Sequence, residues 1–109
     1  MDLVNNIQSA TEQLNTSLRK LRETGTEYAK AEKEYKVLLR QEALKARDSG
    51  MAIGMIDKTI YGVPEVAEKR FLRDVAETVY QANKEAINVL KLQIRIMEAQ
   101  LQREWGHRE

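Results

Sequence analysis

The chain contains no cysteine, and its 109 residues include one proline and one histidine. Without cysteine there can be no disulfide, no thiolate metal site and no cysteine nucleophile, and such a composition suits a reducing cytoplasm. Because His107 is the only histidine, the sequence also cannot supply the residues of a typical zinc site or of a nucleophilic triad. We therefore expect a protein that is not an enzyme and that uses no metal or cofactor.

Long apolar runs and an excess of one charge are also missing. No stretch approaches the roughly 18 apolar residues of a membrane span, and the N-terminal segment lacks the basic and apolar regions of a signal peptide. The 18 basic and 17 acidic residues give a net charge of +1, which provides no overall attraction for nucleic acid or anionic lipid. The glycine-rich stretch GMAIGMIDKTIYG lacks the Gly-Lys-Ser/Thr ending of a phosphate-binding loop. We expect a cytoplasmic protein that does not bind membranes.

Helix-forming residues are abundant, and their apolar positions recur with helical spacing. The pattern predicts a single all-α domain (a helical hairpin or three-helix arrangement with a long C-terminal helix, assembled as an oligomeric bundle). We expect helices at about 2–23, 26–49 and 64–105, with Gly25 and Gly50 ending the first two, and a short helix at 55–61 within a packed connection at 50–63.

The last predicted helix contains a segment, residues 90–96, that alternates like a strand. Steps of 100° per residue resolve the alternation into two apolar rows and one polar side, which favours a helix. The apolar arc spans roughly 220°, more than one helix pair covers. At 1.5 Å per residue the helix is also roughly 60 Å long, more than a compact domain accommodates. We therefore expect a homodimer or higher oligomer; a kink that folds the helix back is the alternative. The expected interface consists of Asn83, Ile87, Leu90, Ile94, Met97, Leu101 and Trp105.

Two tyrosines and two cations form a candidate ligand site. Tyr28 and Tyr35 are seven residues apart, hence on one helix face, with Lys36 and Arg40 close by. Such a face could stack a base while the cations hold its phosphates. The alternative is that the two tyrosines are core residues whose hydroxyl groups reach the surface.

The stretch LKARDSGMAIGMI is similar in spacing to a helix-turn-helix, with Ala46 before the turn, Gly50 in it and Ile56 after it. The helix that would read DNA offers only one cation, Lys58, and also carries Asp57. Recognition helices use several polar or basic side chains, so we expect DNA binding less than other forms of binding.

Three stretches carry a resemblance that covers most of the chain: LRETGTEYAKAEKEYKVLL, RDSGMAIGMIDKTIYGVPEVAEKRFLRDVAETVY and EAINVLKLQIRIMEAQLQREW. Together they resemble small helical proteins encoded by phages and prophages of Gram-positive bacteria. The resemblance implies an accessory protein in the cytoplasm of an infected or lysogenic cell. It would block a host defence protein, sequester a cyclic nucleotide signal, or assist replication and recombination.

Overall fold

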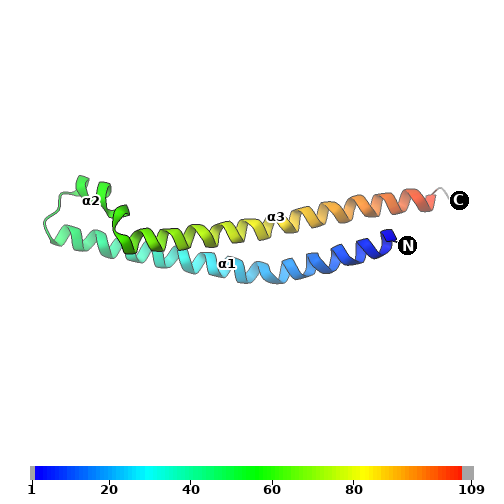
Figure 1. Cartoon of the computed structure of the whole chain (residues 1–109), viewed down its shortest axis with the longest axis horizontal. Coiled ribbons are helices and arrows are strands. Elements are labelled where there is room, and N and C mark those ends of the chain that lie inside the picture. Colours follow the sequence, from blue (N-terminus) through cyan, green and yellow to red (C-terminus); the bar gives the residue numbers. More distant parts are fainter. Residues whose placement is uncertain (1, 107–109) are drawn as a thin grey trace. The chain divides into compact units, whose positions relative to one another are not determined.

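The computed structural model describes residues 2–106. In chain order they form α1 (Asp2–Asp48), α2 (Ile53–Thr59), the 3-10 turn η1 (Ile60–Gly62) and α3 (Pro64–Gly106) (Figure 1). The all-α class and the long C-terminal helix are therefore confirmed. The strand-like segment 90–96 lies within α3. Its alternation arises because two apolar rows run along one helix.

The prediction that Gly25 ends the first helix is wrong, because α1 continues without a break from Asp2 to Asp48. Glycine ends a helix efficiently only where it adopts the left-handed conformation, and among the described residues Gly50 alone has a positive φ, of 89°. A helical glycine costs about 1 kcal/mol relative to alanine. Thr24 and Thr26 beside Gly25 are weak helix formers, but the good helix formers beyond them and the packing of α1 against α3 outweigh that cost.

Gly50 does end α1, as predicted, through a Schellman motif. Its backbone N–H donates to the carbonyl oxygen of Arg47 at 3.0 Å, and the N–H of Met51 donates to that of Ala46 at 3.1 Å. These bonds satisfy carbonyl groups that the last helical turn would otherwise leave without a partner. The short helix predicted at 55–61 begins two residues earlier, at Ile53, and gives way to η1 at Ile60.

The chain forms two compact units, each built from parts of both long helices. Unit 1 combines the first part of α1, to Glu23, with the second part of α3, from Tyr80. Unit 2 is Thr24–Val79 and contains α2 and η1. That the whole chain behaves as one domain stays a prediction.

Unit 2 is a helical hairpin closed by α2. The ion pairs Glu34–Lys69 and Glu32–Arg73, each 3.3 Å long, show that its two long segments run antiparallel. Ile56 and Ile60 are buried, as is Val66 in the first turn of α3. Ile56 and Ile60 fix the glycine-rich connection onto the helices, as predicted, whereas Ile53 and Met55 in the same segment are 73% and 51% exposed, so the connection is packed only in part.

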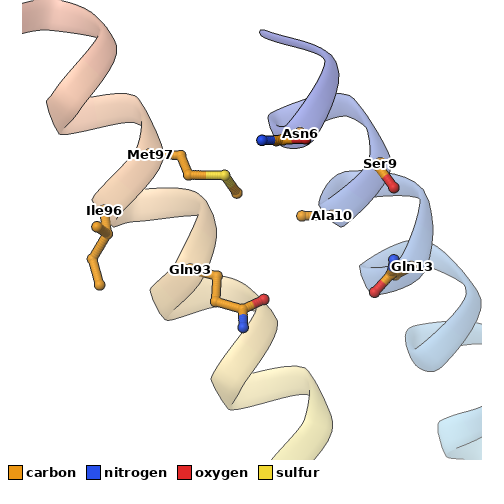
Figure 2. A pocket seen from close by; sticks show the side chains of 7 residues that line it. All are labelled: Asn6, Ser9, Ala10, Gln13, Gln93, Ile96 and Met97. Atoms are coloured by element: carbon orange, nitrogen blue, oxygen red, sulfur yellow. The ribbon is translucent and has the colours of Figure 1, made fainter. Parts of the chain in front are cut away.

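Unit 1 is a second antiparallel helix pair. The side-chain Nδ2 of Asn83 on α3 donates to the carbonyl oxygen of Ser17 on α1 at 3.0 Å. Nearer the chain ends, Met97 extends from α3 toward Ala10 on α1 (Figure 2). Ala10 and Ile87 are the buried apolar residues of this unit. Because so few apolar side chains of unit 1 are buried, much of its apolar surface stays in contact with water.

Candidate interaction surface

The predicted oligomer interface lies mostly on the side of α3 that meets α1 within unit 1. Ile87 is buried, and Asn83 bonds to α1. Leu90, Ile94, Met97 and Leu101 are half-buried along the same side, whereas Trp105 is 60% exposed. That these seven residues make contacts between subunits stays a prediction. Within one chain, all of them except Trp105 lie on the side of α3 that pairs with α1.

A second row on α3 is the one that unit 1 leaves uncovered. It consists of five exposed side chains, and we call it the outer row: Ala82, Ala86, Val89, Gln93 and Ile96. Val89 and Ile96 are 43% and 56% exposed, and the adjacent Leu92 is 55% exposed. The second apolar row that the sequence indicates contains Val89, Leu92 and Ile96 and continues backward through Ala82 and Phe71, so it overlaps the outer row only in part. The sequence does not show which row α1 covers.

An open groove runs between the outer row and α1. One part, of about 660 Å³, is lined by Ser9, Gln13 and Thr16 from α1 and by Ala86, Val89 and Gln93 from α3. The next part, of about 370 Å³, reaches Asn6, Ile96 and Met97 (Figure 2). Glu12 is the one charged residue that lines either part. The groove therefore has one apolar wall and a single charged side chain, Glu12, on the other.

Unit 2 has an uncovered apolar row of its own. Phe71, Leu72, Val75 and Val79 on α3 are between 43% and 60% exposed. Isolated apolar side chains on a surface are normal, but several along one helix indicate an interaction site.

Of the predicted ligand residues, Tyr35 belongs to the core of unit 2. It is 6% exposed, and the guanidinium carbon of Arg73 lies 4.7 Å from the centre of its ring. Nη1 of Arg73 also contacts Glu32 Oε1 at 3.3 Å, and its Nε donates to Asp74 Oδ1 at 2.7 Å. Arg73 thus occupies a ring face on which a base would stack, which agrees with the core alternative.

Tyr28 lies in the same polar cluster. Its pKa is raised above the ordinary 10.0, first because surrounding protein partly desolvates the phenolate and then because the carboxylates of Glu77 and Glu32 repel it. The pKa of Arg73 is raised too, mainly by its hydrogen bond to Asp74. The neighbouring carboxylates of Glu32, Glu77 and Asp74 therefore favour the protonated forms of both Tyr28 and Arg73.

Lys36 and Arg40 line a different hollow. It has a volume of about 290 Å³ and is shared with Asp57 and Tyr61. Arg70 lies 5.5 Å above the ring of Tyr61, while Lys36 also pairs with Glu32 at 3.5 Å. The sequence did not indicate Tyr61 as part of this site. The fold of α2 and η1 brings Tyr61 close to Lys36 and Arg40, and no regular spacing along the chain predicts that contact.

The proposed DNA-reading element is α2, which has seven residues and a single cation in its last turn, Lys58. One side of it, at Ile56, is buried within unit 2. This geometry is that of a packed connection between α1 and α3.

Between Asp2 and Gly106, neither long helix contains a stretch apolar enough to cross a bilayer. The same residues bring together no group of three or more histidine, aspartate or glutamate side chains that could hold a metal ion. Comparisons of the chain with protein-family models, with curated proteins and with solved structures find no match.

Proposed function

We propose that the protein acts by binding and not by catalysis, as a homo-oligomer, in an accessory or counter-defence role in the cytoplasm of a phage-infected or lysogenic cell. The observation that carries the binding role is the uncovered apolar row on α3 in each unit. The phage context is supported by the resemblance of the sequence alone.

The amount of exposed surface supports self-association. The chain exposes 8376 Å², about 2,200 Å² more than the roughly 6,200 Å² expected of a compact monomer of 12.6 kDa. A stable protein–protein interface buries about 1,200–2,000 Å² in total. Half of that area, about 600–1,000 Å², lies on each chain, so one interface of ordinary size would remove between a quarter and half of the excess.

Light scattering coupled to size exclusion tests the oligomer. We expect a mass of at least twice 12.6 kDa, with a melting temperature that rises with protein concentration because association stabilises the folded chain. A mass of 12.6 kDa at every concentration would refute the proposal.

The counter-defence role needs a test in cells. We expect production of the chain to raise the plating efficiency of a phage that a host defence system restricts. The variant Val89→Asp should lose this effect while accumulating to the same level. An unchanged plating efficiency across a panel of defence systems would refute the counter-defence role but not self-association.

A second candidate function is the sequestration of a cyclic nucleotide. It is favoured by the hollow in unit 2 where Lys36 and Arg40 meet Tyr61, since cations suit a phosphate and an aromatic ring suits a base. A cyclic dinucleotide should raise the melting temperature of the parent but not of Arg40→Ala or Tyr61→Ala. No shift across a panel of cyclic mono- and dinucleotides would exclude this candidate.

A further inference from the structure

The spacing of the outer row indicates what kind of surface would cover it. Ala82, Ala86, Val89, Gln93 and Ile96 follow one another at intervals of four, three, four and three residues. This 3.5-residue repeat is the pattern that one helix presents to another in a coiled coil. The row is exposed along its whole length, and α1 packs against a different side of α3. A helix is therefore the partner that fits it.

The charges of this part of α3 lie away from the outer row. At 100° per residue, four charged positions fall on the far side of the helix from the row, while Glu85 lies beside it. The four are Lys84, Lys91, Arg95 and Glu98. The opposite wall of the groove carries one charge, on Glu12, among the uncharged side chains of Ser9, Gln13 and Thr16. Such a surface suits an apolar helix and offers nothing to the phosphates of a nucleic acid.

Side-chain size along the outer row specifies the partner further. The row begins with Ala82 and Ala86, has Val89 at its centre and ends with Ile96. An antiparallel copy of the same row, related by a two-fold axis at Val89, would place each Ala82 opposite an Ile96. Small residues would then face large ones along the contact, as close packing requires. A parallel copy would place alanine against alanine at one end and crowd isoleucine against isoleucine at the other.

We infer that the groove of unit 1 binds α3 of a second copy of this chain, so that the two α3 helices form an antiparallel pair centred on Val89. The inference rests on the proposed self-association and names its surface and geometry. The excess of about 2,200 Å² of exposed surface is enough for such an interface.

Adjacent aspartate substitutions test the surface. Val89→Asp places a charge at the centre of the contact and should weaken the dimer about a hundredfold or more, because the charge would be buried without a partner. Asn88→Asp introduces the same group one residue away, on the exposed far side, and should leave the dimer intact. Both variants should keep the helical circular dichroism of the parent, and light scattering reports the mass.

The absence of natural cysteine allows a second test, of direction. Val89→Cys should form a disulfide-linked dimer under mild oxidation, since the two-fold axis brings each Val89 next to its own copy. Ala82→Cys and Ile96→Cys should each stay uncrosslinked alone and should crosslink when mixed. Ala82→Cys that crosslinks to itself would indicate a parallel pair and overturn the inference.

The outcomes separate the inference from the proposed function. An oligomer that survives Val89→Asp and does not crosslink through Val89→Cys would refute this surface but keep self-association. A parent chain that is monomeric would refute both.

Discussion

Arg73 makes three different interactions, and two of them connect the two long segments of unit 2. Its guanidinium stacks on Tyr35, contacts Glu32 across the hairpin and bonds to Asp74 on its own helix. The side chain is only 19% exposed, so little water competes for these contacts. An ordinary surface ion pair contributes little to stability, but a planar cation that both stacks and bonds in a part-buried place contributes more.

We expect Arg73→Ala to lower the free energy of unfolding by about 1–3 kcal/mol, because it removes the stacking and leaves Glu32 without this partner. Arg73→Lys should restore only part of the loss, since an ammonium group cannot stack and bond in the same plane. Arg95→Ala, at an exposed position of α3, is the control and should stay within about 0.5 kcal/mol of the parent. Urea denaturation measures all three; an Arg73→Ala variant as stable as the control would contradict the prediction.

The raised pKa of Tyr28 predicts how stability changes in alkali. The folded chain holds the phenolic proton more tightly than the unfolded chain, so the contribution is fully present below pH 10.0 and is lost as pH rises through the folded pKa. The free energy of unfolding should therefore fall above about pH 10 more steeply in the parent than in Tyr28→Phe. Glu77→Gln should bring the pKa of Tyr28 down toward 10.0, as followed by NMR of ring-labelled tyrosine. An unchanged pKa in that variant would show that the carboxylate has no such influence.

Residue-level geometry was only partly predictable. The sequence placed Tyr28 and Tyr35 on one face and offered the core as an alternative, which the burial of Tyr35 supports. It could not show that Arg73, 38 positions further along the chain, would cover the ring. Asn83 is predicted at the contact between subunits, and that stays a prediction; within the chain its partner is the backbone carbonyl of Ser17. Neither contact has a signal in local spacing.

At the scale of single elements, two glycines of similar appearance have opposite roles. Gly25 lies inside α1, whereas Gly50 ends it with a left-handed backbone. Residues after Gly25 continue the apolar stripe of α1, while those after Gly50 belong to a glycine-rich segment without one. Glycine alone is therefore a weak stop signal, and the residues that follow it decide whether the helix goes on.

Two other substitutions test the role of backbone conformation. An added Cβ meets no atom within 4 Å at Gly50 or at Gly54, so space does not distinguish them. Gly54→Ala in α2 should stabilise the fold by about 0.5–1 kcal/mol, because alanine favours a helix. Gly50→Ala should destabilise it by about 1–2 kcal/mol, because φ is 89° there. Thermal unfolding compares the pair; a shift of the same sign in both would contradict the explanation.

At the scale of the whole molecule, the sequence predicted the fold class and the uninterrupted C-terminal helix. It also predicted more apolar surface than one chain can cover, and the structure leaves several large apolar side chains on α3 exposed. It did not predict which row of α3 would meet α1. Both rows repeat with helical spacing, and only the contacts of the folded chain distinguish the row that meets α1 from the outer row.

Neighbouring positions on α3 should therefore respond differently to the same change. Leu90 lies half-buried on the side that meets α1, so Leu90→Asp should lower the free energy of unfolding by about 3 kcal/mol or more. Val89→Asp should instead dissociate the oligomer and leave the helix pair folded. Circular dichroism and light scattering on both variants check this. Equal loss of helix in the two variants would show that the rows do not have separate roles.

The antiparallel pairing of α1 with α3 also has a consequence for folding kinetics. The contact between Glu34 and Lys69 closes a loop of 35 residues, whereas that between Ser17 and Asn83 closes one of 66. The longer loop costs about 0.6 kcal/mol more entropy, unless the shorter one has already formed. The contacts between α1 and α3 should therefore form first near the turn at α2 and later toward the chain ends. Pulsed hydrogen exchange during refolding should show amides of unit 2 protected before those of unit 1.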